Sequence, residues 1–124
     1  MTPLSSNVNY FPRHFRLITA GDYRQVFSKP KRVSTPDLLF LFTRNELPTS
    51  RLGLAIAKKQ LPLAVDRNRI KRLVRESFRV KRLEINSLDI VVMARKGLLK
   101  MDNTQVRQQL DKLWSQTINK GKKL

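Results

Sequence analysis

Cysteine is absent from this chain of 124 residues, and histidine occurs only once. Without thiols the protein can form no disulfide framework, no thiolate nucleophile and no thiolate-ligated zinc or iron–sulfur site. The lone histidine, His14, has no second histidine with which to share a metal ion. Together these two shortages exclude most thiol and imidazole chemistry.

Acidic residues are also scarce. Nine Asp and Glu stand against 26 Lys and Arg, which gives a formal net charge of +17. Positive charges at this density repel one another and oppose compaction, and a polyanionic partner relieves that repulsion. Nucleic acid is therefore the favoured partner, and an acidic membrane surface is the weaker alternative. His14 is expected to lie at the surface or contact RNA rather than act as a metal ligand or catalyst.

Long apolar runs are missing too. No run approaches the roughly 20 residues that span a bilayer, and the N-terminus lacks the apolar core of a secretory signal, so we expect a cytoplasmic protein with no membrane partner.

The acids are scattered without a close pair on one helical face, and no Gly-rich phosphate loop occurs. The sequence therefore predicts no catalytic residue and no metal site in the protein alone.

Length and hydrophobic patterning predict a single α+β domain at residues 17–119, flanked by an irregular or mobile arm at 1–16 and a basic, disordered tail at 120–124. Within the domain we expect helices at 20–28, 64–83 and 102 or 103 to 119, and strands at 38–43, 51–57 and 89–94, with a short extra strand near 33–34. The strands at 38–43 and 51–57 are expected to pair antiparallel. The strand at 89–94 can lie parallel to the one at 51–57 through a crossover.

The helix at 64–83 carries the strongest functional pattern. At 100° per residue, Ile70, Leu73, Val74 and Ser77 face the sheet with Phe78 at the margin, while Asn68, Lys71, Arg72, Arg75, Arg79 and Arg82 face outward. A run of mixed charges is usually only a solvated face, but here Glu76 is the only acid after the cap region. Like charges at this spacing destabilise a helix, so the pattern favours a phosphate-binding face.

Aromatic residues offer a second candidate surface. Tyr23 and Phe27 on the first helix, with Phe40 or Phe42 on the first long strand, are candidates for stacking unpaired bases. Aromatic residues at these spacings are more often core, which remains the alternative for all four. Trp114, on the apolar stripe of the last helix, is assigned to the core.

The run from Arg67 to Phe78 resembles the arginine-asparagine-arginine signature of the bacterial ribonuclease P protein component. Three further stretches resemble the same family in the same order, at 22–27, 51–59 and 89–97. The resemblance implies a central four-stranded sheet with three helices and an unusual left-handed βαβ crossover. It also implies a protein subunit without catalytic residues, since in this family the RNA subunit, with bound Mg²⁺, removes the 5′ leader of precursor tRNA.

The expected partners are thus the catalytic RNA, with one protein per RNA, and precursor tRNA. The basic pattern and the resemblance together predict a set of residues that contact the catalytic RNA. These residues are Lys58, Lys59, Arg67, Asn68, Arg69, Lys71, Arg72, Arg75 and Arg79. The resemblance also implies a leader-binding cleft, lined here by Tyr23, Phe27, Phe40 and Phe42.

Three other functions share parts of this pattern. A ribosomal or other structural RNA-binding protein would have the same charge and would co-purify with a ribosome-sized particle. A small transcription factor would need a companion helix and usually a dimer to place its basic helix in the major groove. A self-sufficient nuclease would cut precursor tRNA with no RNA added.

Overall fold

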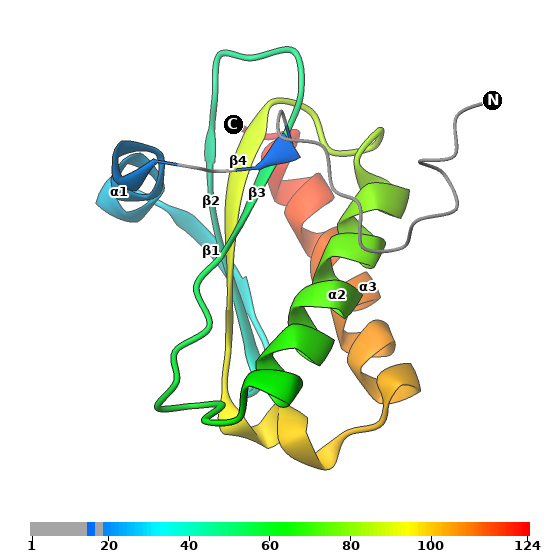
Figure 1. Ribbon diagram of the computed structural model, residues 1–124. Coiled ribbons are helices and arrows are strands. Elements are labelled where there is room, and N and C mark those ends of the chain that lie inside the picture. Colours follow the sequence, from blue (N-terminus) through cyan, green and yellow to red (C-terminus); the bar gives the residue numbers. More distant parts are fainter. Residues whose placement is uncertain (1–14, 17–18) are drawn as a thin grey trace, which may run out of the picture.

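A computed structural model describes residues 15–16 and 19–124 (Figure 1). His14 and the expected arm up to that residue lie outside the described residues. The elements are α1 (Ala20–Ser28), β1 (Lys31–Ser34), β2 (Leu38–Arg44), β3 (Arg51–Leu54), α2 (Ala64–Lys81), β4 (Leu88–Ala94), the 3-10 helix η3 (Lys96–Lys100) and α3 (Asn103–Gly121). The α+β class, the bounds of α1 and the short extra strand are confirmed.

The four strands form one mixed sheet in the order β1-β2-β4-β3. β2 pairs antiparallel with both β1 and β4, while β3 pairs parallel with β4. The parallel pair is confirmed, but the expected pairing of the strands at 38–43 and 51–57 is wrong. β4 lies between β2 and β3. Every residue of β4 except Met93 is buried, as expected for an interior strand. The hand of the β3-α2-β4 crossover stays a prediction from the resemblance.

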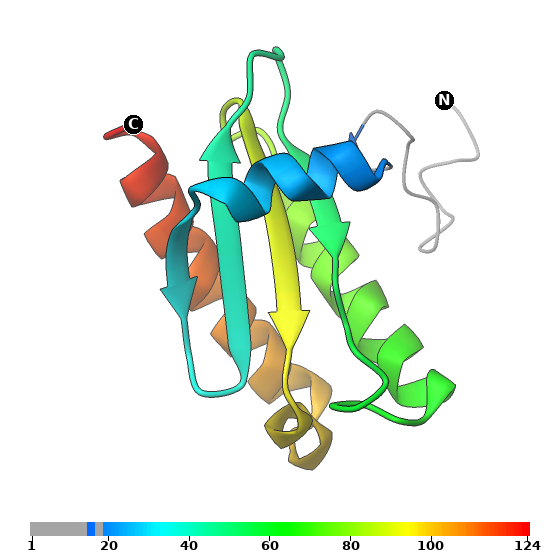
Figure 2. The same ribbon diagram turned by 90° about the vertical axis from the view of Figure 1, so that its left-hand side faces the viewer.

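The helices cover the two faces of the sheet unequally. α2 and α3 lie side by side on one face, and α1 crosses the other face alone (Figures 1 and 2). Between the sheet and the helix pair, the Trp114 ring lies 4.5 Å from that of Phe40 and 5.7 Å from that of Phe78, centroid to centroid. All three are fully buried, so the assignment of Trp114 to the core is confirmed.

α1 is held to its face of the sheet by a small second core. Val26 and Val91 are fully buried there, and Tyr23, Leu41 and Met93 pack around them. Thr19 is the N-cap of the helix. Its hydroxyl accepts from the Asp22 N–H at 3.1 Å, and the Asp22 carboxylate accepts from the Thr19 N–H at 3.0 Å. This capping box satisfies two amide groups that have no helical partner.

Element ends differ from the sequence-based prediction where tertiary contacts intervene. β3 stops at Leu54 instead of residue 57, because the chain turns at 58–60 to bury Leu61. α3 continues through Gly121, whose carbonyl accepts from the Arg44 guanidinium at 3.3 Å. The disordered tail expected at 120–124 is therefore wrong for its first two residues. The short helix η3 was not predicted from the sequence.

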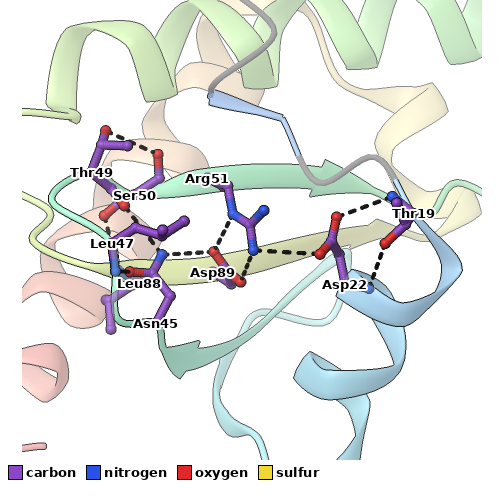
Figure 3. Close-up of polar contacts among 9 residues, drawn as sticks. All are labelled: Thr19, Asp22, Asn45, Leu47, Thr49, Ser50, Arg51, Leu88 and Asp89. Carbon is purple, nitrogen blue, oxygen red and sulfur yellow. Dashed lines mark hydrogen bonds and ion pairs between the residues drawn. The ribbon is translucent and has the colours of Figure 1, made fainter.

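A polar network under α1 joins three strand ends (Figure 3). The Arg51 guanidinium donates to both carboxylate oxygens of Asp89, at 2.9 and 2.7 Å, and lies 3.6 Å from a carboxylate oxygen of Asp22. Asn45 Nδ2 donates to the same Asp89 carboxylate at 2.7 Å. Because the Asp89 side chain is only 5% exposed, this network fixes β3 to β4 and to the start of α1.

Candidate nucleic-acid interface

The outward face of α2 is basic as the sequence predicts. Asn68, Arg72 and Arg79 are exposed, and Lys71 and Arg75 are half-buried at its side. The opposite side is apolar, with Ile70, Leu73, Val74 and Phe78 buried. Phe78 is thus a core residue, and its predicted position at the margin is wrong, because Phe15 and Trp114 enclose it.

Two arginines of the same helix bind the protein itself. The Arg67 guanidinium donates to the carbonyl oxygens of Leu61 and Pro62, both at 2.8 Å. Arg69 donates to the Asn103 side chain at 2.8 Å and to the Met101 carbonyl. These contacts fix the start of α2 to the preceding turn and to the start of α3. The structure therefore separates Arg67 and Arg69 from the exposed row of Asn68, Arg72 and Arg79.

Arg75 lies in a densely positive part of the surface. Burial lowers the pKa of its guanidinium below the ordinary value, and the charge of Arg16 lowers it further. Arg16 is exposed and forms a parallel bridge with Leu52 on the outer edge of β3. An arginine remains charged despite such a shift. The two guanidinium groups therefore concentrate positive charge where α2 faces the β3 edge, and sequence patterns alone did not indicate Arg16.

Lys58 and Lys59 extend the positive surface beyond β3. Both are exposed and lie in the turn at 58–60, which leads into α2 through Leu61. Their place next to the start of α2 is set by Arg67, which holds the carbonyl groups at 61 and 62. The sequence predicts that these lysines contact the same RNA as the outward residues of α2, and their positions agree with that prediction.

The Tyr23 side chain packs against the backbone of β3 at Gly53 and Leu54. Its hydroxyl accepts from the Leu54 N–H at 3.3 Å, and a Cβ built at Gly53 would stand 2.8 Å from the ring. Gly53, with no side chain, therefore allows this close approach of the ring to the strand. Phe27, one helical turn further along α1, is 43% exposed. Both aromatic rings lie on the α1 side of the sheet.

Phe40 and Phe42 do not belong to that surface. Both are fully buried, and both contribute to the core between the sheet and the pair α2 and α3. Side chains alternate along a strand, so Leu39 and Leu41 face α1 while the two phenylalanines face the opposite way. The prediction that these phenylalanines line a cleft with Tyr23 and Phe27 is wrong.

We expect replacement of Gly53 by alanine to move the Tyr23 ring off the sheet. The cost in stability should be about 1 kcal/mol, because the ring end can swing away and the main loss is one hydrogen bond. Urea unfolding measures this change. Gly21→Ala is the matched control, since its new Cβ would meet nothing closer than 3.7 Å. Equal stability of the two variants would contradict the close packing of Tyr23 on Gly53.

The described part of the chain contains no group of three or more His, Asp or Glu side chains that could hold a metal ion. In the same residues, no helix combines the length and the apolar composition that crossing a bilayer requires. The site is defined instead by cations on α2 and on the turn at 58–60, and the two aromatic rings of α1 lie on the other face of the sheet (Figure 2). These features define a class of protein, a small basic α+β protein with one strongly basic helix face.

Comparisons with known proteins identify the family. The family model described as Ribonuclease P matches residues 11–118. The ribonuclease P protein component of Histophilus somni is 48% identical over 108 residues, which are 87% of this chain and 91% of the relative. That of Pasteurella multocida is 47% identical over 113 residues, 91% of this chain and 95% of the relative. The solved RNase P protein from Thermotoga maritima superposes with a TM-score of 0.72 at 34% identity, covering 82% of this chain and 96% of that one. The chain belongs to the ribonuclease P protein family.

Proposed function

We propose that this chain is the protein subunit of a ribonuclease P ribonucleoprotein, in which a catalytic RNA removes the 5′ leader of precursor tRNA. Family membership supports this role. The observation that carries it is the basic outer face of α2, with Asn68, Arg72 and Arg79 exposed over an apolar, buried opposite face. Such a face neutralises phosphates and releases their counterions, whatever the sequence of the bound RNA.

In this proposal the catalytic RNA binds the exposed row of α2, with Arg75, Lys71, Lys58 and Lys59 at its border. Arg67 and Arg69 then act mainly by fixing the start of the helix through their own carbonyl contacts. Mg²⁺ is bound mainly by the RNA and supplies the charge stabilisation at the reacting phosphate. One protein binds each RNA.

The precursor's leader binds the α1 side of the sheet near Tyr23 and Phe27. An unpaired base can stack on the Phe27 ring, which is 43% exposed, and such stacking contributes about 1–3 kcal/mol per base. Tyr23 presents less of its ring because β3 covers part of it. The leader surface thus contains two of the four predicted aromatic residues, and Arg16 adds a cation at the β3 edge.

Cleavage assays at two magnesium concentrations test the proposal. Purified protein should accelerate cleavage of precursor tRNA by its partner RNA at low magnesium and have less effect at high magnesium, because the cations of α2 and Mg²⁺ screen the same repulsion between two RNAs. Protein without RNA is the control and should cut nothing. If adding the protein left the rate of precursor tRNA cleavage at low magnesium unchanged, the proposed function would be wrong.

A further inference from the structure

A second group of cations lies at the sheet edge opposite β3, and we call it the basic edge. β1 is the outer strand on this side, and its neighbours are the ends of α1, β2 and α3. The basic edge consists of Lys29, Lys31, Arg32, Arg44, Lys120 and Lys123, all exposed. None of the ion pairs found among the described residues includes any of them.

Backbone contacts hold these cations together. Lys120 Nζ donates to the Arg32 carbonyl at 3.0 Å, which joins α3 to β1. The Arg44 guanidinium donates to the carbonyl oxygens of Gly121 and Leu124 at 3.3 and 3.2 Å, which joins the end of β2 to the end of α3. The basic edge is therefore a continuous surface built from segments far apart in the sequence. The proposed contact with the catalytic RNA does not use it.

α1 connects the leader surface to the basic edge. The helix crosses the sheet from the side of β3, where it begins, to the side of β1, where it ends (Figure 2). Tyr23 contacts β3 near the start of this path, Phe27 lies exposed in the last turn, and Lys29 follows immediately as the C-cap. A single-stranded RNA that stacks a base on Phe27 thus meets cations in both directions along the helix.

We propose that the basic edge binds the phosphates of the distal part of a long 5′ leader, after the leader has passed Phe27. This inference rests on the proposed function. Aromatic rings that stack bases next to cations that hold the backbone are the usual composition of single-strand binding surfaces. In β1, Arg32 faces the α1 side of the sheet, and Lys31 faces the opposite side with the buried Val33. The strand can therefore hold phosphates as the leader turns around the sheet edge.

Precursor tRNAs that differ only in leader length test this inference on the assembled ribonucleoprotein. One carries a leader of a few nucleotides and the other a leader several times longer. The variant Lys29→Gln/Arg32→Gln should bind the long-leader precursor roughly tenfold more weakly, and the slope of log K against log salt should fall by about 1.4, since each single-strand phosphate contact contributes about 0.7. Binding and cleavage of the short-leader precursor should not change.

The matched control is Lys100→Gln/Arg107→Gln, which also removes two exposed cations but from η3 and the first part of α3. It should leave both precursors unaffected. Unchanged binding of the long-leader precursor by the basic-edge variant would overturn the inference. An equal loss for both precursors would also overturn it, and weaker binding of the catalytic RNA alone would then assign the basic edge to that RNA.

Crosslinking gives a second measurement on the unaltered protein. A photoreactive base at the 5′ end of the long leader should attach to the peptide that contains residues 27–32. Attachment only to other peptides would contradict the inference. Failure of the proposed function gives a different result, because the unaltered protein would then not promote cleavage even of the short-leader precursor.

Discussion

Replacing Asn68, Arg72 and Arg75 together by alanine is expected to weaken binding of the catalytic RNA by at least about 100-fold. Hydrogen bonds to charged groups contribute about 1.5–3 kcal/mol each, so the loss of even two such contacts reaches this size. Processing of precursor tRNA at low magnesium should fall with it. Filter binding and single-turnover cleavage measure the two effects. The fold should persist, because Asn68 and Arg72 are exposed and Arg75 is only half-buried.

Lys100→Ala/Arg107→Ala is the charge-matched control for this variant, since it removes two exposed cations from a different surface. It should bind and process RNA like the unaltered protein. Circular dichroism at increasing temperature checks that both variants remain folded. If the triple variant kept both complex formation and tRNA maturation, the basic face of α2 would not be the RNA-binding surface, and the assignment would fail.

Replacing Asp89 by alanine is expected to lower the free energy of unfolding by about 3–5 kcal/mol. This is the usual cost of removing one partner of a buried ion pair, because Arg51 would keep only the more distant carboxylate of Asp22, at 3.6 Å, as a counter-charge. Here the Arg51 guanidinium would lose its two hydrogen bonds to the carboxylate, and Asn45 would lose another. An arginine guanidinium stays protonated in a protein even when it loses its counter-ion, so the charge of Arg51 will not be relieved by deprotonation. Urea unfolding measures the loss.

Asp111→Ala provides the control for that measurement. Asp111 is exposed on α3, and surface substitutions of this kind usually change stability by less than about 0.5 kcal/mol. The Asp89 variant should also loosen α1, because Arg51 lies 3.6 Å from Asp22 in the first turn of that helix. Equal urea midpoints for the two variants would show that the network in Figure 3 contributes little to stability.

The elements of this fold were accessible to sequence analysis because their signals are local. Thr19 and Asp22, three residues apart, form a capping box at the start of α1, and the apolar stripe around Trp114 gives α3 its buried face. The order of strands was less accessible, because neighbours in the chain often pair and nothing near residues 38–57 shows that β4 comes between them. Its place follows from a pairing between residues far apart in the sequence.

In the candidate site, too, the sequence predicted the features that depend on local periodicity and missed those that depend on distant contacts. Helical periodicity correctly placed Asn68, Arg72 and Arg79 outward. It could not show that Arg69 would reach the start of α3, because that contact joins residues 34 positions apart. The alternation of Leu39, Phe40 and Leu41 was visible in the sequence, but which side α1 would cover was not. The two phenylalanines were therefore assigned to the wrong face.

The position of Trp114 also provides a spectroscopic probe. It is the only tryptophan in the chain, it is fully buried, and its indole N–H donates to the Ser77 hydroxyl at 2.8 Å. Its fluorescence emission therefore reports on the packing of α3 against α2, while bases bound to the outer cations cannot reach the ring to quench it. Stopped-flow emission can thus separate the kinetics of chain folding from those of ribonucleoprotein assembly in a single unlabelled sample.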